Sequence, residues 1–305
     1  MWRNRQGDRG HRRRVRTAAL PRGPVELFRR ALIARVVGIF NDQARGEAPV
    51  VRSDNAMFPT SAVIWRVHGD VTTMMIGGVT ALLLQMLHPA ALSGVWDHSN
   101  FRKDMLGRLR RTARFIAVTT FGDRDLAMEA IARVRSIHDK VVGVAPGGSP
   151  YRAADPMLLA WVHVAEATCF LAAWRAYGEP QMSLADQDDY FAQSATVARA
   201  LGADPVPQSR NEADAILSDF RPMLGVDHRT REVARLILHP KPARITDMPA
   251  QALLMRAAID LLPPWARKMH GLSHSGLTAP LVHGGTNALA ETLRWAFATP
   301  QNFSR

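Results

Sequence analysis

The sequence predicts an all-α fold, organised as a single multi-helix globular domain, on three observations. Apolar residues recur at helical spacing through most of the chain, glycine and proline separate these segments, and no run alternates for long enough to indicate a strand. With 305 residues, of which 47% are hydrophobic and 22% charged, the chain can also bury a sizeable core.

The helical pattern can be followed along the chain from Pro24, which suits a first helical position because its missing N–H leaves no helical hydrogen bond unmade. Ser183 and Ser209 precede Asp186 and Glu212 by three residues, which is the spacing of a capping box or close to it. Glycine or proline predicts breaks at 143–150, 178–180, 202, 240–242 and 263–264. The predicted helices cover 24–44, 123–143, 155–177, 184–202, 211–221, 226–238, 249–262 and 284–298.

The run 71–96 carries no formal charge, and its 26 residues are enough to cross a bilayer. It also contains a Gly-Gly pair, several threonines and a glutamine, and Pro89 would clash inside one continuous helix. The run therefore predicts two shorter core helices, one ending near His88 and one starting at Pro89, and no transmembrane segment. A bilayer span and a helix lying on a membrane surface are the alternatives.

The net charge of +12 is concentrated at the N-terminus. Residues 1–22 hold eight arginines against Asp8 alone, which gives +7 and leaves +5 for the remaining 283 residues. This composition predicts a disordered Arg-rich tail, followed by the helical domain at 23–305. Such a tail can touch phosphates or anionic lipid without sequence specificity, and no specific nucleic-acid site is predicted.

Two further features bear on location. An arginine run also begins twin-arginine export signals, but no apolar segment follows it before Pro21, so we reject export. Cys169 is the only cysteine, which excludes a disulfide framework within the chain, and no Cys/His cluster suggests a structural zinc site. We therefore expect a cytoplasmic protein.

One predicted helix sets a histidine into an apolar stripe. Ala127, Ile131, Val134, His138 and Val141 follow one another at spacings of four, three, four and three, so they share one face. A neutral imidazole in an apolar wall is what an iron ligand requires, because coordination uses the deprotonated nitrogen. A buried histidine with an ordinary hydrogen-bond partner is the alternative interpretation.

A second helix carries Arg108, Arg111, Thr112 and Phe115 on one face, since the last three lie three, four and seven residues after the first. Arginine keeps its charge at accessible pH, so the two guanidinium groups either reach solvent or face an anion. Facing an anion, they would provide a fixed positive field for propionates, bound superoxide or a developing oxyanion.

Five segments together resemble a known family: WRVHGD (65–70), LLLQMLHPAALSGVWDHSNF (82–101), RLRRT (108–112), RVRSIHDKVVG (133–143) and YRAADPMLLAWVH (151–163). They are similar to the bacterial and fungal family that groups the latex-clearing (rubber) oxygenases with the oxygenase of mycophenolic acid biosynthesis that cleaves a farnesyl chain. The resemblance covers roughly residues 60–300.

The resemblance implies an all-helical fold that holds a b-type haem, with His138 as the axial ligand of the iron. It also maps Arg108 and Thr112 onto an arginine-lysine-threonine set above the haem in the rubber-cleaving branch. Arg111 stands where that branch has lysine, and guanidinium cannot offer iron a lone pair as lysine can. The resemblance assigns no residue here to the acidic base of that branch.

These features predict an oxidoreductase: a haem b-dependent oxygenase that uses dioxygen on a small hydrophobic substrate, such as an isoprenoid, to cleave a carbon–carbon double bond. Arg108 and Arg111 would stabilise negative charge on the distal oxygen, and Thr112 would donate a hydrogen bond.

Three alternatives stay open. The protein could bind haem without turnover, for storage, sensing or transfer. It could use a non-haem metal held by His163 and Glu166, which lie three residues apart on one predicted helix. It could also be a nucleic-acid or lipid-surface module that acts through its basic tail. The family-like segments also contain His88 and His98, to which we assign no role.

Overall fold

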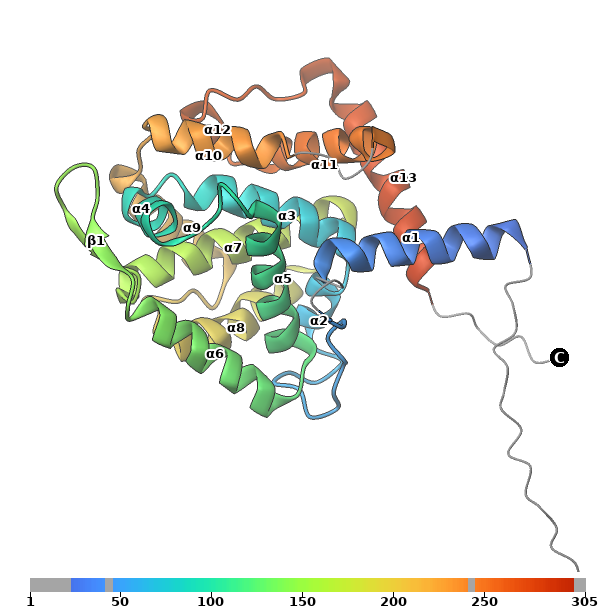
Figure 1. The fold of residues 1–305 in the computed structure, drawn as a ribbon, viewed down its shortest axis with the longest axis horizontal. Helices are drawn as coiled ribbons and strands as arrows, with labels where there is room; N and C mark the ends of the chain where they lie inside the picture. Colours follow the sequence, from blue (N-terminus) through green and yellow to red (C-terminus); the bar gives the residue numbers. More distant parts are fainter. Residues whose placement is uncertain (1–22, 42–45, 241–244, 299–305) are drawn as a thin grey trace, which may run out of the picture.

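The computed structural model describes residues 23–41, 46–240 and 245–298. Within these ranges the chain forms helices joined by short loops and one small antiparallel sheet, which confirms the all-α prediction (Figure 1). The α-helices are α1 (Pro24–Phe40), α2 (Val63–His68), α3 (Val71–Gln85), α4 (Pro89–His98), α5 (Met105–Phe121), α6 (Arg124–His138), α7 (Pro156–Tyr177), α8 (Leu184–Leu201), α9 (Arg210–Phe220), α10 (His228–Leu238), α11 (Met248–Leu261), α12 (Pro264–Met269) and α13 (Ala279–Phe297). The strands are β1 (Val142–Val144) and β2 (Pro150–Arg152), and short 3-10 turns lie at 221–223, 245–247 and 276–278.

Most predicted helices are present, and their starts are capped as the sequence indicates. The Ser183 hydroxyl accepts a hydrogen bond from the amide of Asp186 at 3.0 Å, and the Ser209 hydroxyl accepts one from the amide of Glu212 at 3.3 Å. Three boundaries differ from the prediction by more than two residues: α1 ends at Phe40 instead of 44, α6 ends at His138 instead of 143, and α13 begins at Ala279 instead of 284. The predicted tail, 1–22, lies outside the described residues.

The uncharged run forms the two helices that were predicted. α3 ends at Gln85, α4 starts at Pro89, and the two are bent by 105° at the break. By length and composition α7 is the one described helix that could cross a membrane, and most of it is buried inside the protein. One such mostly buried helix is weak evidence for a membrane span.

The core is organised around α3 and α7, which share the most extensive helix–helix contact among the described elements (Figure 1). The two backbones approach closely at Gly77, because a Cβ atom there would lie 2.8 Å from Phe170 Cδ1 and 3.0 Å from the Cys169 carbonyl oxygen. Trp161 is fully buried on α7, and its indole nitrogen donates to the Gln85 carbonyl at 3.0 Å. This contact fixes the end of α3 against the second turn of α7.

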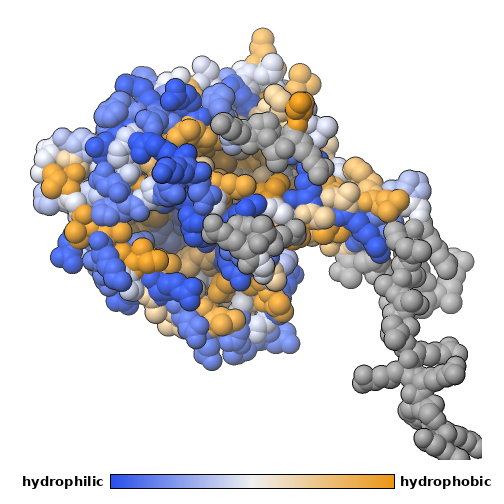
Figure 2. Space-filling view, in the orientation of Figure 1, coloured by the Kyte–Doolittle hydropathy of each residue, from blue (hydrophilic) through white to orange (hydrophobic). Residues whose placement is uncertain are grey.

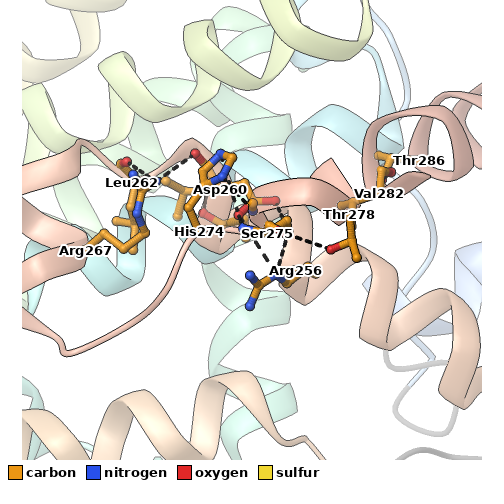
Figure 3. A network of polar contacts seen from close by, with 12 residues as sticks. Arg256, Asp260, Leu262, Arg267, His274, Ser275, Thr278, Val282 and Thr286 are labelled. Atoms are coloured by element: carbon orange, nitrogen blue, oxygen red, sulfur yellow. Dashed lines mark hydrogen bonds and ion pairs between the residues drawn. The ribbon is translucent and has the colours of Figure 1, made fainter. Parts of the chain in front are cut away.

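A polar network joins the end of α11 to α12 and to the loop that leads to α13 (Figure 3). The Asp260 carboxylate accepts hydrogen bonds from the Ser275 amide, at 2.9 Å, and from the Ser275 hydroxyl. Arg256 donates to the same hydroxyl at 2.6 Å, while Thr278 donates to the Ser275 carbonyl at 2.8 Å. The loop between α12 and α13 is therefore tied to the end of α11.

The close approach at Gly77 generates a prediction with a matched control. Gly77→Ala should lower the free energy of unfolding by about 1–3 kcal/mol, because the added methyl group overpacks against Phe170 and backbone. Gly78→Ala should be neutral or stabilising by up to about 1 kcal/mol, since its Cβ would meet only Phe170 Cε1 at 3.7 Å and alanine favours the helix. Chemical denaturation of both variants checks this, and equal effects would contradict the packing described.

Candidate functional site

The site begins with the hairpin of α5 and α6. Only Gly122 and Asp123 separate the two helices, which pack against each other, so they run antiparallel. Asp123 caps α6 by accepting from the Asp125 amide at 2.9 Å. His138 ends α6 and Arg108 lies in the first turn of α5, so both are at the ends away from the connecting turn, from which the two helices diverge (Figure 1).

His138 presents a neutral imidazole at this end of the hairpin. Its side chain is half-buried, and its Nδ1 atom is buried with no hydrogen-bond partner in the described structure. Burial lowers the pKa of His138, while the charge of Asp139 acts in the opposite direction. The apolar stripe leading to it is confirmed within the helix, since Ala127 and Ile131 are buried, whereas Val141 lies beyond its end.

The central helix α7 brings Glu166 towards α5. Burial raises the pKa of the Glu166 carboxyl, and its hydrogen bond to Gln85 and the charge of Arg108 act in the opposite direction. For Arg108, burial and the neighbouring Arg111 lower the pKa of the guanidinium, while Glu166 raises it. Arg108 and Glu166, contributed by two different helices, thus influence each other electrostatically.

His163 lies one turn before Glu166 on α7. Its Nε2 atom is buried and lacks a hydrogen-bond partner among the residues described. Burial, assisted by the positive charge of Arg199 on α8, lowers the pKa of His163 to about 4. Arg135 on α6 donates to the Ala200 carbonyl at 3.3 Å, so the ends of α6 and α8 meet beside this part of α7.

The other two predicted residues of α5 differ in position. The Arg111 side chain is 59% exposed and forms an ion pair with Asp104 at 3.5 Å. Thr112 is half-buried, and its hydroxyl donates to the Arg108 carbonyl at 3.3 Å. Arg108 therefore points into the protein, Arg111 reaches solvent, and the roles of all three residues stay predictions.

The remaining histidines of the family-like segments are His68, His88 and His98. His88 is the N-cap residue of α4, and its ring lies 6.1 Å from that of Trp161 between centroids. Like that of His138, its Nδ1 atom is buried without a hydrogen-bond partner in the described structure, and burial lowers its pKa. His98 Nε2 lies 3.1 Å from the Val142 carbonyl oxygen. His68 is held between Thr120 and Tyr190, at 2.8 and 3.1 Å, and burial lowers its pKa to about 3.

Sequence reasoning missed the link between Glu166, Arg108 and Gln85. A signal was present, because Glu166 is the only acidic residue within α7, an otherwise mainly apolar helix. Two cavities, of about 590 and 240 Å³, lie elsewhere: Trp265 and Met269 line the first, and Ser93 and Arg229 the second. Among the described residues, no three His, Cys, Asp or Glu side chains are grouped to hold a metal ion.

Comparison with known proteins gives one match. The family described as ER-bound oxygenase mpaB/B′/Rubber oxygenase, catalytic domain, matches residues 65–295, which include α3 to α12 and most of α13. No curated protein and no solved structure matches the chain significantly. Because the match covers well over half of the chain and includes Arg108, His138 and Glu166, the chain belongs to the mpaB/rubber oxygenase catalytic domain family.

Proposed function

We propose that this protein is a haem b-dependent oxygenase that acts on a small hydrophobic substrate. Membership of an oxygenase family supports the reaction class. The observation that carries the cofactor assignment is His138, a neutral imidazole at the end of α6 whose Nδ1 atom is buried without a partner. An isoprenoid substrate, cleaved at a carbon–carbon double bond, is the specific form of this proposal.

The residues at the site fit a haem held by one axial histidine. A buried imidazole nitrogen without a partner is unfavourable by about 1–3 kcal/mol. The binding of a haem by this histidine would offset that cost. Burial lowers the pKa of His138 and so favours the neutral imidazole, which is the form that coordinates iron. The haem, when bound, would supply the redox chemistry towards dioxygen.

The protein's own groups would set the electrostatics. Arg108 is a permanent positive charge on the inward side of α5, where reduced solvent screening makes it effective on negative charge that develops nearby. Glu166 would hold a proton on its carboxyl group more readily than an exposed glutamate, because burial raises its pKa. Gln85 would fix the orientation of that carboxyl through its hydrogen bond.

The remaining residues would position and shield the reactants. Thr112 lies one turn after Arg108, and its hydroxyl would donate to an oxygen atom near the same side of α5 by turning away from the Arg108 carbonyl to which it now donates. Phe115 and Val162, both half-buried, would contribute apolar surface for the substrate. We keep the cytoplasm as the proposed location, which the free, buried Cys169 supports.

A second candidate is a haem protein without turnover, and His163 is the observation in its favour. Its Nε2 atom is another buried imidazole nitrogen without a partner, on α7, which packs against α8. If both histidines bound one iron, the site would be closed to dioxygen, as in a carrier or sensor. The spectra of two single variants separate these functions.

His138→Ala should lose haem, or bind it only with added imidazole, because the change removes the proposed axial ligand. His163→Ala is the matched control: it also truncates a buried imidazole with a lowered pKa, but should retain haem with an unchanged spectrum. Absorption spectra of the folded fraction of each variant provide the measurement. An unchanged spectrum in His138→Ala would refute the ligand assignment, and altered ligation in both variants would favour the carrier.

The two arginines of α5 should differ in their effect on a ligand of the iron. A nearby positive charge lowers the stretching frequency of carbon monoxide on ferrous haem, so Arg108→Gln should raise that frequency. Arg111→Gln should leave it close to the wild-type value, because Arg111 is exposed and paired with Asp104. Infrared spectra test this without a known substrate. A larger shift in Arg111→Gln than in Arg108→Gln would contradict the assigned inward role.

A further inference from the structure

A cavity of about 240 Å³ lies between the start of α4, the tip of the β1–β2 hairpin and the start of α10. Helix α4 contacts both β1 and α10, so the three elements enclose this space at one end of the protein (Figure 1). Leu92, Ser93 and Thr230 line it as buried residues, whereas Pro146 and Gly147 of the hairpin tip line it and are exposed. A space of this size holds a small organic molecule.

The surface around the cavity is mixed in character. Hydrophobic and hydrophilic residues are interspersed on the visible face of α4 and the hairpin (Figure 2). Large apolar patches mark sites for other macromolecules. The mixed surface directs attention to the cavity, and therefore to a small ligand.

Ser93 brings an unpartnered hydroxyl group to the cavity. Its side chain is 1% exposed, and its Oγ atom is buried with no hydrogen-bond partner in the described structure. Hydroxyl groups on helices commonly donate to the carbonyl one turn earlier, as Thr80 and Thr119 do here, each at 2.9 Å. Because a buried hydroxyl without a partner is unfavourable, Ser93 needs an explanation other than packing.

Arg229 brings two more unpartnered donors. Its Nε and Nη1 atoms are buried and have no hydrogen-bond partner among the described residues. Nη1 lies 3.7 Å from the Asp97 Oδ1 atom, which is an ion pair but too long for a hydrogen bond. The guanidinium carbon lies 5.1 Å from the ring centroid of Trp96, so the aromatic ring supports the group while its N–H groups stay unpaired.

The charges around the cavity oppose an anionic ligand. Asp97 already balances the charge of Arg229, and Asp227 adds a second carboxylate to the lining. The Asp227 carboxylate accepts from the amide and the hydroxyl of Thr230, at 2.9 and 3.1 Å, so it is fixed at the start of α10. An anion would therefore meet two negative charges and one positive charge.

The unpartnered donors require an acceptor oxygen on an otherwise apolar molecule. A carbonyl oxygen can accept two hydrogen bonds without adding a donor of its own. The hydrocarbon part of such a molecule would contact the apolar residues of the lining, which are Pro89, Leu92, Pro146 and Val226.

We propose that this cavity binds a small neutral carbonyl compound, a ketone or an aldehyde, whose oxygen accepts hydrogen bonds from Arg229 and Ser93. The site stands without the oxygenase proposal, because it contains neither His138 nor Arg108. Cleavage of a carbon–carbon double bond by dioxygen places one oxygen atom on each carbon and gives two carbonyl groups. The products of the proposed oxygenase therefore belong to this ligand class, and that link alone rests on the proposed function.

The test is isothermal titration calorimetry of the full chain with cyclohexanone and with cyclohexanecarboxylate. Wild-type protein should bind the ketone saturably and the carboxylate more weakly. Arg229→Met should weaken ketone binding about tenfold or more, because the N–H donors are lost. Arg229→Lys keeps the charge opposite Asp97 and should also weaken it, since an ammonium group does not replace the donors of the planar guanidinium.

Ser93→Ala gives a readout that a structural role would not produce. Ketone binding should fall about threefold or more, whereas the melting temperature should stay the same or rise, because a buried unpaired hydroxyl is removed.

Arg102→Met is the matched control. Arg102 also stacks on Trp96, at 3.7 Å from the ring centroid, but its Nε atom donates to Glu232 at 2.8 Å and it is not part of the cavity lining. This variant should bind cyclohexanone like the wild type. Absence of saturable cyclohexanone binding by the wild type would overturn the proposal, as would unchanged binding by folded Arg229→Lys. Tighter binding of the carboxylate than of the ketone would overturn the neutral ligand class.

Discussion

The packing of α3 against α7 is the constraint on which the rest of the structure depends. Gly77 allows the two helices to approach closely, because a side chain on this residue would collide with Phe170 and the Cys169 carbonyl oxygen. Eight residues further along α3, Gln85 reaches Trp161 and Val162 on α7, as expected for two antiparallel helices in contact over two turns. A shift of either helix would therefore separate the groups at both positions.

The same contact builds the inner wall of the candidate site. Glu166 lies between Val162 and Phe170 on α7, so the register that brings Gln85 to the start of this segment also brings its amide to the Glu166 carboxyl. Helix α5 supplies Arg108, whose charge acts on Glu166, and His138 lies at the far end of α6. Ionisable groups inside an apolar helical core are unfavourable unless they are paired or used, which is why perturbed pKa values indicate functional sites.

Much of the fold was predictable because helix signals are local. Pro89 divides the uncharged run at the position where the structure divides it, and the Ser183 and Ser209 caps need only three residues of spacing. The helices α2 and α12 were missed because six residues are too few to display a period. The strands β1 and β2 have three residues each, and α13 begins five residues before its predicted start, with Pro280 in its first turn.

The candidate site was predicted only in part, for a different reason. His138 belongs to a pattern within α6, and Arg108 belongs to a pattern within α5. The spacing of residues within each pattern is visible in the sequence. The electrostatic interaction of Arg108 with Glu166 depends on how α5 and α7 pack, and so does the exposure of Arg111. No local sequence pattern encodes that packing. The burial of His163 and its electrostatic link to Arg199 likewise arise from the contact of α7 with α8.

If the helical core holds a haem, as we propose, the haem and iron content of the wild-type protein shows it most directly. The protein should be purified from cells supplied with haem and iron, in folded form. We expect about one haem b and one iron per chain, with a spectrum that changes when carbon monoxide is added to the reduced protein. A folded, colourless and iron-free protein that also fails to take up added haem would contradict it.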